Sequence, residues 1–192
     1  QPTGLAEFDR ALGGGLVPGS AILLGGDPGI GKSTLLLQAA ARVAETGRRV
    51  LYCSGEESPH QIRARGERLG IGGPPLYLLA ETCVARVLEE ITRLSPGLVI
   101  IDSIQTMYVD NLDSAPGSVA HVRSSAQELI RFAKRIDFDE LIVRPDQFKR
   151  CLDTDRPEAG LAIERVSHSG APLANGRLDL EGLHRHAHIM DP

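Results

Sequence analysis

A glycine-rich stretch near the start of the chain has the composition of a phosphate-binding loop. It follows the spacing G-x-x-x-x-G-K-[ST] in the octapeptide Gly26-Asp27-Pro28-Gly29-Ile30-Gly31-Lys32-Ser33, with Thr34 next. Glycines let a backbone fold tightly around an anion, so that successive N–H groups point at phosphate oxygens. A helical run from Leu35 to Val43 follows, and the first turn of a helix adds unpaired donors and the positive end of its dipole.

Two side chains of this loop suit direct contact with a triphosphate and its metal. Lys32 is expected to reach the β- and γ-phosphates, and Ser33 is expected to ligate Mg²⁺. A glycine-rich turn that merely precedes a helix is the alternative, but the apolar residues 21–24 before the loop favour the phosphate site. The sequence therefore predicts that residues 26–34 bind a nucleoside triphosphate, with Mg²⁺ as its metal.

Acidic residues stand at the ends of two predicted strands. Asp102 follows the apolar run 98–101, and a carboxylate there can hold a magnesium-bound water beside a phosphate loop. Glu56 and Glu57 follow the predicted strand 50–54, and one of them is predicted to orient or deprotonate the attacking water. The simpler roles are strand capping for Asp102 and stabilisation of the next helix N-terminus for the two glutamates.

An amide side chain lies just beyond the second acidic position. Gln105 follows Asp102 by three residues, so it could sense the γ-phosphate and relay the loss of that phosphate to the next loop. An ordinary surface amide is the alternative for Gln105.

Strands and helices that would position these residues alternate along the chain. Short apolar runs predict strands at 21–24, 50–54, 76–79 and 98–101. Helical spacing predicts helices within 3–12, 35–43, 59–69, 84–94 and 118–133, with Ser58 and Thr82 as expected caps of the third and fourth. This alternation is typical of an α/β fold with a parallel sheet covered by helices on both faces. Because ligands bind at the carboxyl ends of such strands, the loop and the acidic residues are expected to meet there.

The overall composition suits one domain and excludes several classes of protein. The chain has 192 residues, 42% of them hydrophobic, and a net charge of −4, so it has no general basic field for nucleic acid. Its three cysteines are far apart and form neither a zinc pattern nor a disulfide framework, which fits a reducing cytoplasm. No apolar stretch approaches the ~18 residues that a membrane span needs. We therefore expect a cytoplasmic protein that does not bind membranes.

Residues 2–134 resemble the ATPase core of the bacterial RadA/Sms family, proteins of DNA repair and recombination. Besides the phosphate loop, the resemblance is carried by residues 12–20 (LGGGLVPGS), 54–58 (SGEES), 101–106 (IDSIQT) and 114–119 (SAPGSV). It implies a RecA-like P-loop fold and a homo-oligomeric ring, with six subunits expected and ATP bound between them. It also implies ATP-driven processing of single-stranded or branched DNA, in company with a RecA-type recombinase. By position, Glu56 matches the catalytic glutamate of RecA-like proteins better than Glu57 does.

The resemblance and the helical periodicity both end near Arg135. We therefore expect a RecA-like ATPase core at residues 1–135 and a divergent or poorly ordered C-terminal segment at 136–192. Residues 141–143 could form a strand, although Pro145 follows at once. The strand ending and the Lys-Asn-Arg-Phe-Gly motif that the family carries next are not recognisable, so a sheet incomplete at its C-terminal end and a terminus read out of frame are both open.

The leading interpretation is an ATPase that acts on DNA in recombinational repair. A nucleotide-gated binding module, which binds ATP but has no motor activity, is the alternative that the missing motifs favour. A small-molecule P-loop kinase is a third option, but no segment has the composition of an acceptor pocket with lid arginines.

Overall fold

The computed structural model describes residues 1–71, 76–110, 112, 115, 117–135, 140–144, 162–166 and 172–177. The helices are α1 (Ala6–Ala11), α2 (Lys32–Glu45), α3 (Pro59–Arg68), α4 (Val84–Leu94), α5 (Val119–Arg135) and the short 3-10 helix η1 (Ile104–Thr106). The strands are β1 (Ser20–Gly25), β2 (Val50–Ser54), β3 (Leu76–Ala80), β4 (Leu98–Asp102), β5 (Glu140–Arg144), β6 (Ala162–Val166) and β7 (Pro172–Arg177). Every helix and strand predicted from the apolar spacing is present, with its ends shifted by at most a few residues.

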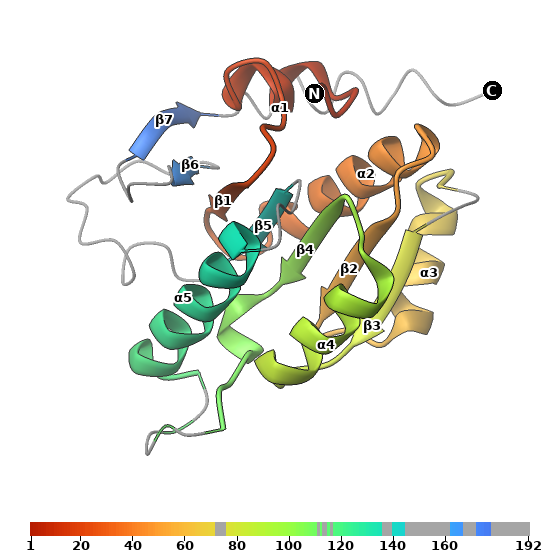
Figure 1. Ribbon diagram of the computed structural model, residues 1–192. Coiled ribbons are helices and arrows are strands. Elements are labelled where there is room, and N and C mark those ends of the chain that lie inside the picture. The colour runs from red at the N-terminus through yellow and green to blue at the C-terminus, as the bar shows by residue number, and fades with distance from the viewer. Residues whose placement is uncertain are drawn as a thin grey trace.

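The strands form one sheet in the order β3-β2-β4-β5-β1-β6-β7 (Figure 1). All neighbours from β3 to β1 pair in parallel, whereas β6 runs antiparallel to β1 and β7 antiparallel to β6. Parallel neighbours need crossover connections, and α3, α4 and α5 supply three of them. The predicted α/β fold class, a parallel sheet within a P-loop domain, is confirmed.

Strand β5 lies in the middle of the sheet, between β4 and β1. Its first residue, Glu140, is level with Leu98 of β4 on one side and with Ser20 of β1 on the other. A strand is thus present at 141–143, where the sequence left this open, and it is central to the sheet. The division of the chain at residue 135 stays a prediction, but β5, β6 and β7 join the same sheet as the strands before them.

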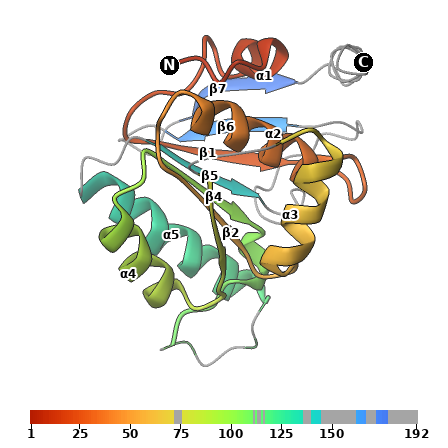
Figure 2. The ribbon, with the colours of Figure 1, turned by 90° about the vertical axis from the view of Figure 1, so that its right-hand side faces the viewer.

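Side chains of the strands alternate between two apolar layers, as the period of a strand requires. In β2, Val50 and Tyr52 pack with residues of α1, α2 and α3, whereas Leu51 and Cys53 pack with residues of α4 and α5. Figure 2 shows α4 and α5 on one side of the sheet and α2 and α3 on the opposite side. The helix that follows the phosphate loop therefore shares a face with Tyr52.

The starts of α3 and α4 use two different capping arrangements. Ser58 Oγ accepts from the Gln61 N–H at 3.3 Å, and Gln61 Oε1 accepts from the Ser58 N–H at 2.9 Å, so the predicted cap is confirmed as a capping box. The expected Thr82 cap of α4 is wrong. The carboxylate of Glu81 instead accepts from the N–H groups of Thr82 at 2.7 Å and Cys83 at 2.9 Å.

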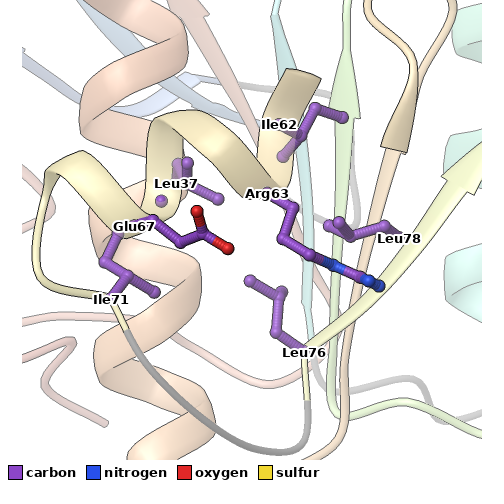
Figure 3. A pocket seen from close by; sticks show the side chains of 8 residues that line it. Leu37, Ile62, Arg63, Glu67, Ile71, Leu76 and Leu78 are labelled. Atoms are coloured by element: carbon purple, nitrogen blue, oxygen red, sulfur yellow. The ribbon is translucent and has the colours of Figure 1, made fainter. Parts of the chain in front are cut away.

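A cavity of about 320 Å³ lies between α2, α3 and the edge strand β3 (Figure 3). Its lining consists mainly of aliphatic side chains, with Arg63 and Glu67 extending from α3 toward β3. None of the residues predicted to bind the nucleotide lines this cavity. Among the described residues, no helix is both long and apolar enough to cross a membrane.

Candidate nucleotide-binding site

The predicted phosphate loop joins the end of β1 to the start of α2. Gly29 and Gly31 have φ values of 79° and 98°, and a Cβ at either position would meet no atom within 4 Å. The glycines are therefore needed for the shape of the backbone, and the space beside them is open. Gly31 begins α2 without a side-chain cap, and the first turn of α2 has no acidic residue. The N-terminal donors of α2 thus suit an anion.

Lys32 packs its side chain beneath the loop, and only 4% of its surface is exposed. Its Nζ donates to the carbonyl oxygens of Gly26 and Asp27, at 2.8 Å in each case. The lysine charge is thus held within hydrogen-bonding distance of the loop backbone, on the strand side of the loop. This placement suits a cation that neutralises charge on a loop-bound polyphosphate.

Ser33 and Asp102 meet although 69 residues separate them in the sequence. Ser33 lies in the first turn of α2, and Asp102 ends β4, with 2% of its surface exposed. The Ser33 Oγ lies 3.4 Å from Asp102 Oδ1. A hydroxyl and a carboxylate are hard oxygen donors of the kind that Mg²⁺ prefers, and Mg²⁺ commonly takes its remaining ligands from phosphate and water. Among the described residues, no cluster of three His, Cys, Asp or Glu side chains could hold a metal on its own.

Tyr52 reaches the other oxygen of the same carboxylate, and the sequence analysis missed this contact. Its side chain is completely buried in β2, and its hydroxyl donates to Asp102 Oδ2. The same hydroxyl lies 3.5 Å from the Ser33 carbonyl oxygen. A polar tip on an aromatic residue within an apolar strand was the available signal, because a buried tyrosine hydroxyl usually has a partner. Cys53 follows Tyr52 in β2, and burial raises the pKa of its thiol to about 12.

The two predicted catalytic glutamates face different partners. Glu56 Oε1 accepts a hydrogen bond of 2.6 Å from Ser103 Oγ, directly after Asp102. Glu57 Oε2 instead pairs with Arg65 of α3 at 2.6 Å. The backbone N–H groups of both glutamates lie 3.1–3.3 Å from Ser54 Oγ, which fixes the turn after β2. Glu56 is therefore the glutamate that the structure links to the end of β4.

Ser103 is a second residue that the sequence analysis missed. It is completely buried, and its carbonyl oxygen accepts a 2.8 Å hydrogen bond from Thr106 Oγ1. Ser103 thus connects Glu56 to η1. Its position beside the candidate metal-site residue Asp102 was the only available signal, and a serine at the end of a strand is too common to stand out.

Gln105 is half-buried in η1, and both polar atoms of its side-chain amide are buried. Among the described residues, neither its Oε1 nor its Nε2 has a hydrogen-bond partner. Its carbonyl oxygen lies 3.4 Å from the position that a Cβ would take at Gly117, just before α5. Gln105 therefore lies between the end of β4 and the start of α5, and its amide has hydrogen-bonding capacity to spare.

The fold and this arrangement of a glycine loop, a lysine, a serine and a strand-end carboxylate define the class of P-loop ATPase domains. A family model described as an AAA domain matches residues 6–144. The chain belongs to this AAA domain family.

Curated relatives make the family more specific. The chain is 56% identical over 132 residues to the DNA repair protein RadA of Halalkalibacterium halodurans, 54% over 138 residues to that of Brucella abortus and 52% over 132 residues to that of Bacillus subtilis. Each comparison covers 69% of this chain but only 29–30% of the relative. The resemblance to the RadA/Sms ATPase core is thus confirmed, and the chain spans less than a third of the length of these relatives.

Proposed function

We propose that the chain hydrolyses Mg-ATP and uses the energy to process single-stranded or branched DNA in recombinational repair. The observation that carries this proposal is the contact between Ser33, directly after the glycine loop, and Asp102. Glu56 accepts a hydrogen bond from Ser103, the residue that follows Asp102. These groups are those needed to bind a triphosphate, hold its metal and prepare a water. The DNA substrate rests on the similarity to proteins named for DNA repair.

In this proposal, the N–H groups of residues 26–34 and the ammonium of Lys32 bind the phosphates. Lys32 would exchange its contacts with the loop carbonyls for the β- and γ-phosphates. Ser33 would ligate Mg²⁺ directly, and Asp102 would hold a water of the same ion. The bound Mg²⁺ would neutralise charge on the β- and γ-phosphates.

Glu56 would orient and deprotonate the attacking water. The hydrogen bond from Ser103 orients the Glu56 carboxylate beside the end of β4. Glu57 remains the alternative base, but its ion pair with Arg65 makes it the weaker candidate. Gln105 would sense the γ-phosphate, since its side-chain amide is buried without a partner among the described residues and its backbone carbonyl lies close to Gly117, before α5.

The expected partners follow from the family resemblance. We propose a homo-oligomeric ring, with six subunits expected and ATP between neighbours, acting in the cytoplasm beside a RecA-type recombinase. Light scattering of the purified chain with and without ATP would test the ring, and a monomer under both conditions would contradict it.

Paired glutamate variants test the chemistry. Glu56→Gln should retain ATP binding and lower the hydrolysis rate by ~100-fold or more, because an amide cannot accept the proton of the attacking water. Glu57→Gln, the same change one residue further on, is the matched control and should retain most of the activity. Loss of hydrolysis in Glu57→Gln alone would move the catalytic role to that residue.

Hydrolysis measured with and without single-stranded DNA tests the coupling to DNA. Faster ATP hydrolysis with DNA would support motor activity, since turnover at the nucleotide site would then depend on the bound strand. ATP binding without turnover, with or without DNA, would instead support a nucleotide-gated binding module.

A further inference from the structure

Tyr52 combines complete burial with a polar contact at the candidate metal site. Its ring lies within the apolar layer formed by β2, β4 and α2, and its surface is 0% exposed. Its hydroxyl donates to Asp102 Oδ2 and lies 3.5 Å from the carbonyl oxygen of Ser33. One side chain of β2 thus reaches both the strand that ends in the carboxylate and the helix that follows the phosphate loop.

The two oxygens of Asp102 have different surroundings. Oδ2 accepts from the Tyr52 hydroxyl, whereas Oδ1 lies 3.4 Å from Ser33 Oγ. A carboxylate can rotate about its terminal bond, since that torsion has a broad and roughly two-fold energy profile. The two oxygens of the group are equivalent, so a hydrogen bond to either one restricts this rotation and holds the other toward Ser33.

We infer that Tyr52 is a positioning residue that turns Asp102 Oδ1 toward Ser33 and thereby prepares the magnesium site. The inference rests on the proposed function, because it assumes that Ser33 and Asp102 serve Mg²⁺. The rigid ring of Tyr52 is fixed by its apolar surroundings, so its hydroxyl has a defined position. Hydrogen bonds from outer-shell partners orient ligating groups in this way, and their loss typically costs about 10–100-fold in metal affinity.

The variant Tyr52→Phe removes the hydroxyl and keeps the ring. We expect the Mg²⁺ concentration that gives half-maximal binding of a fluorescent ATP analogue to rise by about 10-fold, at the low end of the range because Asp102 is proposed to act through a water. Binding of the same analogue in EDTA should stay within about twofold of the wild type, since the Tyr52 hydroxyl donates to the Asp102 carboxylate, which is proposed to serve the metal and not the phosphates. Tyr77→Phe is the matched control, because Tyr77 of β3 is exposed, and it should leave both measurements unchanged.

Thermal unfolding without nucleotide would reveal whether Tyr52→Phe folds, and a second variant is available if it does not. Replacement of Tyr52 by 4-fluorophenylalanine puts a fluorine in the space of the hydroxyl, and fluorine cannot donate a hydrogen bond. It should raise the Mg²⁺ requirement as phenylalanine does.

The outcomes separate this inference from the proposed function. A wild-type Mg²⁺ requirement in the folded variants would overturn the role of Tyr52, as would equal weakening of binding in Mg²⁺ and in EDTA. Binding by the wild type that is indifferent to Mg²⁺ would instead overturn the proposed magnesium site.

Discussion

Alanine at Gly55 should destabilise the domain because the residue has no room for a side chain. Gly55 lies in the turn between β2 and Glu56. A Cβ there would lie 2.1 Å from Thr106 Oγ1, 2.6 Å from Thr106 Cβ and 2.7 Å from Thr82 Cγ2. The φ of Gly55 is not positive, so alanine could adopt the backbone conformation. The destabilisation would come from the steric clash of its Cβ alone.

The magnitude follows from these distances and from a second glycine. Contacts this short must open by about 1 Å or more to reach van der Waals separation, and overpacking of this kind costs ~1–3 kcal/mol. At Gly66 in α3, the nearest atom to a Cβ would be Ile71 Cβ at 3.8 Å, an ordinary contact. Alanine there should stabilise the helix by ~0.5–1 kcal/mol. The two variants should therefore differ by about 1.5–4 kcal/mol, with opposite signs relative to the wild type.

Urea unfolding of Gly55→Ala, Gly66→Ala and the wild type measures both effects. Displacement of Thr106 also disturbs the hydrogen bond that it donates to Ser103, so Gly55→Ala should lower hydrolysis more than nucleotide binding. If Gly55→Ala proves as stable as Gly66→Ala, the close packing of the β2 turn against η1 is wrong.

Three further predictions concern single side chains. Ser103→Ala should lower hydrolysis by about tenfold without weakening nucleotide binding, because it removes one hydrogen bond to the charged Glu56; steady-state rates check this, and an unchanged rate contradicts it. Cys53 has a pKa raised to about 12 by burial, from 9.0, so the unfolded thiol loses its proton first and stability should fall above pH 9.0. Urea unfolding across alkaline pH should show a shallower decline for Cys53→Ala, and equal slopes would contradict it. The pKa of Glu81 is lowered, first by the hydrogen bond from the Cys83 N–H, so its contribution should be present above pH 4.5 and lost as pH falls; acid unfolding of Glu81→Gln should show a flatter slope, and a slope as steep as the wild type's would count against this cap.

Contiguous signals allowed most of the fold to be predicted. The phosphate loop lies within eight successive residues, and the short apolar strands and the striped helices are local patterns. The position of Asp102 at the end of a buried strand was enough to predict its meeting with Ser33, since parallel strands end at the same edge of a sheet.

Contacts between distant side chains could not be predicted in the same way. The hydrogen bonds from Tyr52 to Asp102 and from Ser103 to Glu56 span 50 and 47 residues. They depend on register and rotamer, which a single sequence does not reveal. The expectation of a Thr82 cap failed for a related reason. The Glu81 carboxylate accepts from the N–H groups of Thr82 and Cys83, and the N–H of Val84 donates to the distant carbonyl oxygen of Tyr108. The central place of β5 was hidden because its few apolar residues stand beside a proline.

The late position of β5 in the chain has a consequence for biosynthesis. The phosphate loop follows β1 and the candidate metal-site carboxylate ends β4, yet the strand that joins β1 to β4 is made only after α5. A nascent chain that has emerged from the ribosome only as far as α5 carries both halves of the site without the strand between them. We therefore expect nucleotide binding to arise late in translation, when residues 140–144 become free to pair on both sides.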